Sequence, residues 1–256
     1  MVISMKRWKG KVAIVTGASA GIGAAIVEQL VDAGLQVVGF ARRTDKIEAL
    51  AKKLCRTKGK LHAVKVDISK EEDILAGFKW VSEKLGPVSI LINNAGVLPN
   101  STLVDGSTEE WKKVFDTNVM GLCVATREAV KIMKANKIDG HIIHINSVAG
   151  HKVPNIPNMN VYPASKHAVT ALTETLRQEL NSLGLKIRIT SVSPGGVTTE
   201  LLEANNYVTD PNVKEFLKTV PYLKAEDVAD AVSYVLGTPE HVQVHELLIK
   251  PVGESV

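Results

Sequence analysis

The amino-acid sequence predicts an α/β protein with a Rossmann-type, doubly wound parallel sheet of about seven strands and helices on both faces. Three observations support this fold class. Short β-branched runs alternate with longer helical patterns from residue 11 onwards, a glycine-rich segment follows the first run, and no repeat or linker interrupts the series. Because 45% of the 256 residues are hydrophobic, the chain has enough apolar side chains to form one large core, and we interpret residues 1–256 as a single domain.

In the first half of the chain, each expected strand leads towards an expected helix. The first helix carries Ile26, Leu30 and Ala33 on one stripe and stops at Gly34. Ser69 and Glu72 have the spacing of a capping box ahead of the third helix. The expected strands cover 12–16, 37–40, 61–66 and 89–92, and the expected helices cover about 22–33, the segment through 47–54, and 74–85.

The second half continues the alternation with longer helices. Helices are expected at about 108–135 and 162–183, strands at 141–146 and 187–192, and a further strand-like segment around 241–245. This pattern leaves the order of the strands open. The longest irregular stretch, 195–222, follows a strand, and functional loops in such sheets lie beyond the carboxyl ends of the strands.

Composition argues against several kinds of partner. The 31 Lys and Arg residues exceed the 27 Asp and Glu residues by only four, without a basic block, so nucleic acid is not an expected partner. Cys55 and Cys123 are too few for a disulfide scaffold, and the sequence has no signal peptide and no apolar run of about 18 residues. We therefore expect a cytoplasmic protein without an integral membrane segment.

No metal site is expected from the histidines. His141 and His144 lie three residues apart on an expected strand, so their side chains point to opposite faces. His241 and His245 have helical spacing but lie in a strand-like segment, without acidic companions. We interpret the first pair as structural and predict no metal.

The first expected strand runs directly into the segment TGASAGIG, residues 16–23. Glycine permits a tight turn and the close approach of a phosphate, and the helix that follows offers free N–H groups and the positive end of its dipole. The cofactor-binding residues predicted here are Gly17, Ser19, Gly21, Ile22 and Gly23. The alternative, a turn that merely closes a βα unit, is disfavoured because the segment occupies the first βα turn.

The end of the second expected strand predicts the choice of nucleotide. NAD-binding folds favour an acidic residue there, which accepts hydrogen bonds from the ribose hydroxyls. Here the chain instead has Arg42 and Arg43, whose guanidinium groups suit a 2′-phosphate. We expect NADP(H), with Arg42 as the nearer contact and Arg43 stacked on adenine; the alternative is that both arginines only solvate a loop.

Further motifs follow in order: Asp67, Asn93-Asn94-Ala95-Gly96, Asn118, Ser147, Tyr162-Pro163-Ala164-Ser165-Lys166 and Pro194-Gly195-Gly196-Val197-Thr198-Thr199. Together with the glycine-rich segment, this ordered set resembles the short-chain dehydrogenase/reductase family over nearly the whole chain. The resemblance implies an oxidoreductase that uses a nicotinamide cofactor. It also implies a homodimer or homotetramer built on the two long helices.

The resemblance implies a catalytic set of Asn118, Ser147, Tyr162 and Lys166. The spacing supports part of it, because Tyr162 and Lys166 are four residues apart at the start of a helix and share one face. There the ammonium would lower the pKa of the phenol. Ser147 would hydrogen-bond the substrate oxygen, and Asn118 would hold a water that links the lysine to solvent.

The resemblance adds cofactor-binding residues along the rest of the chain. Asp67 would accept from the adenine amino group, Asn94 would lie beside the adenosine ribose, and Thr199 would bind the nicotinamide carboxamide. As alternatives, Asp67 is a residue that starts a helix and Asn94 belongs to a βα turn. The full additional set is Asp67, Asn94, Ala95, Gly96, Tyr162, Lys166, Pro194, Gly195, Val197 and Thr199.

Within the family, segments 140–180 and 241–254 resemble the insect farnesol dehydrogenase branch, whose vertebrate relatives reduce keto-steroids. This implies a hydrophobic alcohol or carbonyl substrate, farnesol-like or, alternatively, a keto-steroid, an ecdysteroid or a broad set of carbonyls. The Ser147-to-Tyr162 interval is longer than is common in the family. We therefore assign substrate selection to the loop 150–161 and to a lid at about 200–222.

Two other classes of function stay open. A nucleotide-binding regulator would sense NADPH without turnover, but a sensor has no need of the complete catalytic set. An isomerase or dehydratase acting on a sugar nucleotide would lead us to expect a longer C-terminal substrate domain after the seventh strand. The substrate, the direction of the reaction and the choice between dimer and tetramer are not determined by the sequence.

Overall fold

The computed structural model describes residues 3–200, 215 and 220–254. At its centre is a parallel sheet of seven strands in the order β3-β2-β1-β4-β5-β6-β7. The order reverses between β1 and β4, as in a doubly wound fold, and confirms the predicted fold class. The strands are β1 (Val12–Thr16), β2 (Gln36–Ala41), β3 (Lys60–Lys65), β4 (Val88–Asn93), β5 (His141–Ile145), β6 (Arg188–Pro194) and β7 (Glu246–Ile249).

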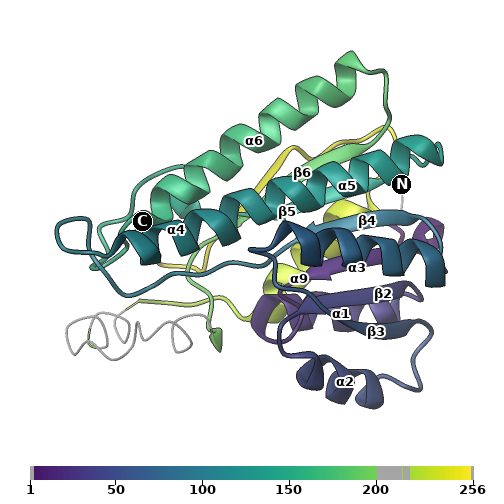
Figure 1. Ribbon diagram of the computed structural model, residues 1–256, viewed down its shortest axis with the longest axis horizontal. Coiled ribbons are helices and arrows are strands. Elements are labelled where there is room, and N and C mark those ends of the chain that lie inside the picture. The colour runs from purple at the N-terminus through teal and green to yellow at the C-terminus, as the bar shows by residue number, and fades with distance from the viewer. Residues whose placement is uncertain (1–2, 201–214, 216–219, 255–256) are drawn as a thin grey trace.

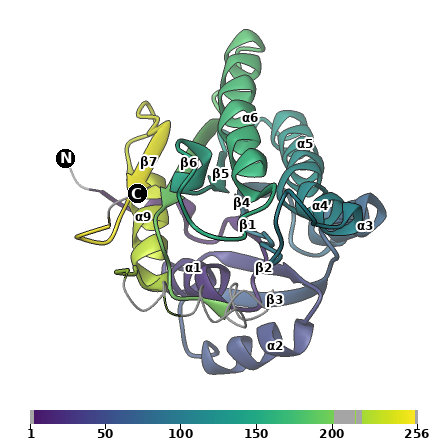
Figure 2. The ribbon, with the colours of Figure 1, turned by 90° about the vertical axis from the view of Figure 1, so that its left-hand side faces the viewer.

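Helices cover both faces of the sheet (Figure 1). Figure 2 shows α1 and α9 side by side on one face, and α3, α5 and α6 on the other. α2 packs against β3 at the edge of the sheet. The helices are α1 (Gly21–Asp32), α2 (Thr44–Lys53), α3 (Glu71–Lys84), α4 (Thr108–Phe115), α5 (Gly121–Ala135), α6 (Tyr162–Ser182) and α9 (Ala225–Gly237).

Burial on both faces explains the composition of the central strands. Every residue of β1, β4, β5 and β6 is buried, as expected for a parallel sheet covered on both sides. Ile26 and Leu30 of α1 belong to the core on one face, and Phe78 and Met133 to the core on the other. Burial of each such side chain stabilises the fold by roughly 1.5–3 kcal/mol, so the two cores fix the strand ends that carry the site.

Local structure differs from the prediction at the start of α3. The N-cap is Lys70, which makes no side-chain capping bond, so the predicted capping box is absent. Asp67 Oδ1 instead accepts hydrogen bonds from the Ser69 hydroxyl and the Ser69 amide, at 2.7 and 3.1 Å. The capping box is absent because the Ser69 hydroxyl is hydrogen-bonded to the Asp67 carboxylate and does not cap α3.

The helix expected over 108–135 is interrupted at its centre. α4 ends at Phe115, and the π-helical turn η2 (Asp116–Met120) connects it to α5. A π turn accommodates one more residue than an α-helical turn and alters the directions of its side chains. Asn118 therefore lies buried inside the molecule, although asparagine within a helix is more often a surface residue.

The carboxyl-terminal part of the chain is described only in part. Most of the predicted lid at 200–222 lies outside the described residues. The strand-like segment around 241–245 precedes the seventh strand, which begins at Glu246. Within the described residues, no helix combines the length and the apolar character that a bilayer span requires.

Candidate active site

A cavity of about 400 Å³ opens at the carboxyl ends of the central strands. Most of the predicted cofactor-binding residues line it: Gly17, Ser19, Gly21, Ile22, Gly23, Arg42, Arg43, Asp67, Asn94, Ala95, Gly96, Tyr162, Lys166 and Thr199. Asn118, Ser147, Pro194, Gly195 and Val197 do not line it. The cavity thus brings together residues that are up to 183 positions apart in the sequence, from Gly17 to Glu200.

The glycine-rich turn is shaped by its contact with the loop after β4. Gly17 and Gly21 have φ of +66° and +53°, the left-handed region that favours glycine. A Cβ at Gly23 would overlap the Gly17 carbonyl oxygen and the Asn94 amide nitrogen. α1 begins at Gly21 without a side-chain cap, so the N–H groups of its first turn face the cavity free of a capping side chain.

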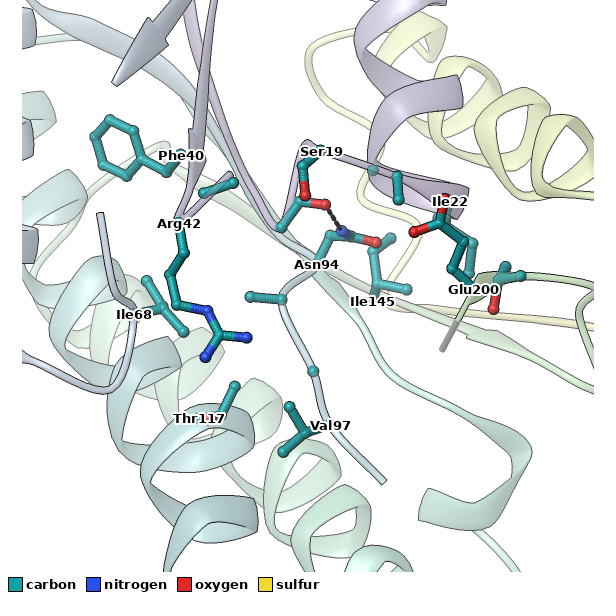
Figure 3. A pocket seen from close by; sticks show the side chains of 18 of the residues that line it. Ser19, Ile22, Phe40, Arg42, Ile68, Asn94, Val97, Thr117, Ile145 and Glu200 are labelled. Carbon is teal, nitrogen blue, oxygen red and sulfur yellow. Dashed lines mark hydrogen bonds between the residues drawn. The ribbon is translucent and has the colours of Figure 1, made fainter. Parts of the chain in front are cut away.

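Asn94 fixes this turn to the sheet. Its Nδ2 donates to the Thr16 and Gly17 carbonyl oxygens at 2.8 and 3.3 Å, while its backbone N–H bonds the Thr16 hydroxyl at 3.0 Å. Figure 3 shows Asn94 at the back of the cavity, beside the glycine-rich turn. The alternative interpretation of Asn94 as a turn residue therefore has direct structural support, although the residue also lines the cavity.

The two arginines after β2 extend in different directions. Arg42 reaches along the cavity wall between Ile68 and Thr117 (Figure 3). Arg43 Nη2 lies 3.3 Å from both the Ser19 hydroxyl and the Glu200 carboxylate. Arg43 therefore contacts the glycine-rich turn, and the expectation that Arg42 is the nearer contact of a 2′-phosphate stays a prediction.

Glu200 is a cavity residue that the sequence analysis missed. Its carboxylate contacts Lys46 Nζ at 3.0 Å as well as Arg43, and these cations lower its pKa. The group is half exposed, so water screens much of the attraction. Only its position next to Thr199 marks it in the sequence, because nothing in the local pattern predicts that the chain brings it to the two cations.

Asp67 lies at the adenine end of the predicted site. Burial opposes its ionisation, but hydrogen bonds from Ser69 and the charges of Arg42 and Lys70 lower its pKa overall. Its backbone N–H donates to Asp73 at 2.9 Å, on the first turn of α3. Asp67 thus takes part in the start of α3 while it lines the cavity, so both interpretations of this residue have support.

Ser147, Tyr162 and Lys166 converge where β5 meets α6. The Ser147 hydroxyl accepts from the Ala149 amide at 3.1 Å, and its influence lowers the pKa of the Tyr162 phenol. Lys166 Nζ donates to the Ile145 carbonyl oxygen at 2.9 Å and lies 5.7 Å from the centre of the Tyr162 ring. Pro163 in the first turn of α6 costs no helical hydrogen bond there.

Burial controls the ionisation of this group in the structure. It raises the pKa of Tyr162 to about 12, although Ser147 acts in the opposite direction. Burial lowers the pKa of Lys166 to about 8. The lowered phenol pKa expected from the spacing is therefore absent: desolvation of the phenolate outweighs the nearby ammonium. A neutral phenol beside a polar serine is equipped to donate a proton to an oxygen.

Asn118 acts on the loop after β4. Its Oδ1 accepts from the Val97 amide at 2.9 Å, and its Nδ2 donates to the Val97 carbonyl oxygen at 3.1 Å. The same Nδ2 lies 3.2 Å from the Ser165 hydroxyl of α6. Asn118 thereby connects η2, the loop that carries Gly96 and Val97, and the helix that carries Tyr162.

Two asparagines hold the segment before Tyr162 in a left-handed backbone. Asn158 and Asn160 have φ of +58° and +41°, and Asn160 Nδ2 donates to the Pro99 carbonyl oxygen at 2.6 Å. Asn158 Nδ2 donates to Asn100 Oδ1 at 2.9 Å. The loop 150–161, assigned to substrate selection, is thus joined to the loop after β4. A small apolar cluster of Leu98, Ala149, Ile156, Met159 and Tyr162 fills the space between them.

A buried polar network connects the sheet to the catalytic helix, and the sequence analysis did not identify it. Asn93 Nδ2 donates to the Thr126 hydroxyl at 2.9 Å, which lies 3.4 Å from His144 Nε2. On the other side His144 Nδ1 lies 3.0 Å from the Thr173 hydroxyl of α6. Burial and the charge of Lys166 lower the pKa of His144 to about 3.

His141 is also buried, with Nε2 2.8 Å from the Thr190 hydroxyl. Both strand histidines are therefore held by hydroxyl groups, which agrees with their structural interpretation. Among the described residues, no cluster of three or more His, Cys, Asp or Glu side chains could hold a metal ion.

The cavity fits a dinucleotide. The uncapped start of α1 and the left-handed glycines supply the backbone cradle that a pyrophosphate requires. Arg42, Arg43, Tyr162 and Lys166 line the same cavity. The arrangement provides an anion site, a proton donor and a neighbouring cation within one cleft, the groups that hydride transfer to a carbonyl needs from a protein.

A family model described as short chain dehydrogenase matches residues 11–208. The chain is 53% identical to farnesol dehydrogenase of Aedes aegypti over 253 residues, which cover 98% of this chain and 100% of the mosquito protein. It is 46% identical to dehydrogenase/reductase SDR family member 11 of Bos taurus over 251 residues, or 96% of this chain and 98% of the bovine protein.

Solved structures agree with these matches. An alcohol dehydrogenase from the archaeon Thermococcus sibiricus, complexed with 5-hydroxy-NADP, superposes with a TM-score of 0.83 at 28% identity and covers 97% of this chain and 99% of its own. A short chain dehydrogenase/reductase from Burkholderia phymatum in complex with NAD has a TM-score of 0.85 at 28% identity, with 97% and 90% covered. Similar folds therefore hold either form of the cofactor.

Proposed function

This chain belongs to the short-chain dehydrogenase/reductase family, and on this basis we propose that it is an NADP(H)-dependent enzyme acting on a hydrophobic alcohol or carbonyl, such as a farnesol-like isoprenoid. One observation carries the proposal: the Tyr162 phenol, with Lys166 Nζ 5.7 Å from its ring, lines the same cavity as the glycine-rich turn. A proton donor and a dinucleotide cradle thus share one cleft.

When bound, the dinucleotide supplies or accepts the hydride. In the reductive direction, Tyr162 donates a proton to the carbonyl oxygen, and its raised pKa keeps the phenol protonated until that transfer. The Ser147 hydroxyl donates a hydrogen bond to the same oxygen as negative charge develops. Lys166 stabilises the phenolate that remains, and its ammonium would also hold the nicotinamide ribose.

The cofactor preference is assigned to the arginines after β2. No acidic side chain occupies the end of β2, where it would accept hydrogen bonds from the ribose hydroxyls of NAD. Two guanidiniums follow instead, and a 2′-phosphate would receive strong charge-assisted bonds from them. The nucleotide would lie along the cavity from Arg43 and Asp67 towards Tyr162, with Thr199 at the nicotinamide.

The substrate class is inferred from the apolar residues packed on Tyr162. Leu98, Ile156 and Met159 form an apolar cluster with the tyrosine, and they come from the two loops that flank it. Apolar surroundings of the proton donor favour a hydrophobic substrate over a charged one. The similarity to the Aedes aegypti farnesol dehydrogenase supports an isoprenoid alcohol as the first candidate.

Turnover with a defined panel tests the proposal. Purified protein is assayed for oxidation of farnesol and for reduction of a keto-steroid and a small aldehyde, each with both phosphorylated and unphosphorylated dinucleotide. Tyr162→Phe serves as the control for enzyme-dependent turnover. Farnesol oxidation with NADP⁺ is the expected result; turnover confined to steroids would replace the substrate, and NADPH binding without any turnover would point to a sensor.

A further inference from the structure

The turn after β6 is held by the last described residue of the chain. Gly196 N–H donates to Glu254 Oε1 at 2.9 Å, across 58 residues of sequence. We propose that Glu254 is a positioning residue for this turn, Gly195–Gly196, and through it for the segment that leads to Thr199. The assignment of that segment to nicotinamide rests on the function proposed above, whereas the contact itself does not.

Steric fit supports a specific pairing between the carboxylate and the turn. A Cβ added at Gly195 would overlap the Glu254 carboxylate. The backbone of Gly195 lies outside the left-handed region, so its conformation does not by itself require glycine. The atoms that this Cβ would meet belong to the end of the Glu254 side chain, so a larger residue at position 195 would displace the carboxylate from the turn.

The other hydrogen bonds of the turn involve backbone groups. Gly195 N–H donates to the Ile249 carbonyl oxygen at 2.8 Å, and the Gly196 carbonyl oxygen accepts from Leu223 N–H at 2.8 Å. The bond to Glu254 is the one that involves a side chain and a charge. Because charge-assisted hydrogen bonds are stronger than neutral ones, Glu254 contributes disproportionately to the position of Gly196.

The tail that carries Glu254 is folded back onto this region. Pro251 is buried after β7, Gly253 has φ of +89°, and Glu254 N–H donates to the Pro251 carbonyl oxygen at 3.2 Å. The tail therefore follows a defined turn and delivers the carboxylate to Gly195 and Gly196. Glu254 is not simply the exposed end of a strand.

Stability of the fold does not account for this residue by itself. Glu254 Oε2 is buried and has no hydrogen-bond partner among the described residues. A buried carboxylate oxygen without a partner opposes folding. The geometry points to a role in fixing the turn beside the proposed cofactor site. This role explains a carboxylate at position 254, although its buried Oε2 opposes folding.

Three variants test the role of Glu254 in the intact protein. Glu254→Gln keeps the acceptor Oε1, Glu254→Ala removes it, and Glu83→Ala removes an exposed carboxylate of α3 as a matched control. Hydrogen exchange at Gly196 in the protein alone, and the NADPH dissociation constant, are measured for each. We expect Glu254→Ala to accelerate exchange at Gly196 and to weaken NADPH binding about tenfold. Glu254→Gln keeps the acceptor but not its charge and should be intermediate, and Glu83→Ala should be close to the native protein.

A double-mutant cycle separates positioning from a general loss of structure. Gly195→Ala should weaken NADPH binding in the native background, by no more than Glu254→Ala does, because its Cβ displaces the Glu254 carboxylate; in Glu254→Ala it should have little effect. Equal effects of Gly195→Ala in both backgrounds, or unchanged Gly196 exchange in Glu254→Ala, would overturn the inference. If exchange responds as expected while the native protein binds no NADPH, the positioning role stands and the proposed function fails.

Discussion

The ammonium of Lys166 donates to the carbonyl oxygen of Ile145, 2.9 Å away at the end of β5. This bond holds a buried cation at the wall of the cavity, beside the face of Tyr162. Burial lowers the lysine pKa to about 8, whereas a lysine in water has a pKa of 10.5. The charge state of Lys166 is therefore sensitive to pH within the range in which enzymes are assayed.

NADPH binding should weaken as the pH rises through about 8. The pKa of Lys166 is depressed, so the ammonium is present below about pH 8 and is lost above it, together with its attraction for the cofactor. Dissociation constants measured from pH 6.5 to 9.5 check this. The Lys166→Met variant should bind more weakly and show little dependence on pH; the same dependence in both proteins would exclude Lys166 as its source.

Tyr162→Phe should reduce kcat by about 10²–10⁴-fold, because the phenol supplies the transferred proton. NADPH binding should change little, since the hydroxyl acts on the substrate oxygen. Lys166→Ala should reduce both kcat and cofactor affinity. Steady-state kinetics and titration with NADPH measure the two effects separately. Tyr234→Phe, on the exposed side of α9, is the matched control and should leave both unchanged.

Arg43→Ala should lower the preference for NADPH over NADH more than Arg42→Ala. Arg43 contacts Ser19 of the glycine-rich turn, whereas Arg42 extends towards Thr117. Loss of a charge-assisted pair with a 2′-phosphate should reduce that preference about tenfold or more. The ratio of the two kcat/KM values reports it, with exposed Arg56→Ala as control. Equal use of NADPH and NADH by the native protein would refute the cofactor assignment.

Asn160→Gly should impair large apolar substrates more than small ones. Glycine retains the left-handed backbone, at φ of +41°, but loses the bond to the Pro99 carbonyl oxygen that joins the loop 150–161 to the loop after β4. Values of kcat/KM for farnesol and for a small aldehyde measure the difference. Asn160→Ala adds backbone strain and should be worse for both substrates. A uniform loss in Asn160→Gly would indicate that the bond serves the fold alone.

His144 should make the protein less stable in mild acid. Its folded-state pKa is depressed to about 3, so between there and its ordinary value of 6.5 the unfolded chain binds the additional proton. Stability should therefore fall as the pH decreases from 6.5, by up to about 1.4 kcal/mol per pH unit from this group. Urea unfolding of His144→Asn should show a shallower pH slope. The exposed control His167→Asn should retain the native slope.

The sheet and the approximate ends of most helices can be predicted from the sequence, because they depend on patterns of residues that are near one another in the chain. Alternation of β-branched runs with helical stripes predicts the parallel sheet, because each element must bury one face. The capping box at Ser69 fails for a related reason: Asp67, two residues away, competes for the same hydroxyl, and spacing alone does not rank such competitors.

The relative positions of side chains within the site are less predictable. The arginines at 42 and 43 are identified by type, but their directions depend on Ser19 and Glu200, which the fold brings from 24 and 157 residues away. The ionisation of Tyr162 likewise depends on burial by distant segments, which outweighs the helix-face contact that the spacing predicts. The polar network through His144 carries no local sequence signal, because its members lie on four elements.

The π turn at Asp116–Met120 can be tested by deleting one residue from it. The turn holds one residue more than an α-helical path, so a chain shortened by one residue within it would relax to a continuous α-helix. α4 and α5 would keep their relative orientation, because the π turn takes up the additional residue in place, but the side chains inside the turn would change direction. Asn118 would no longer face Val97, while the same deletion at the C-terminal end of α5 would leave that contact intact. The chain is thus sensitive to a change in length at one internal turn and tolerant of it a few turns further on.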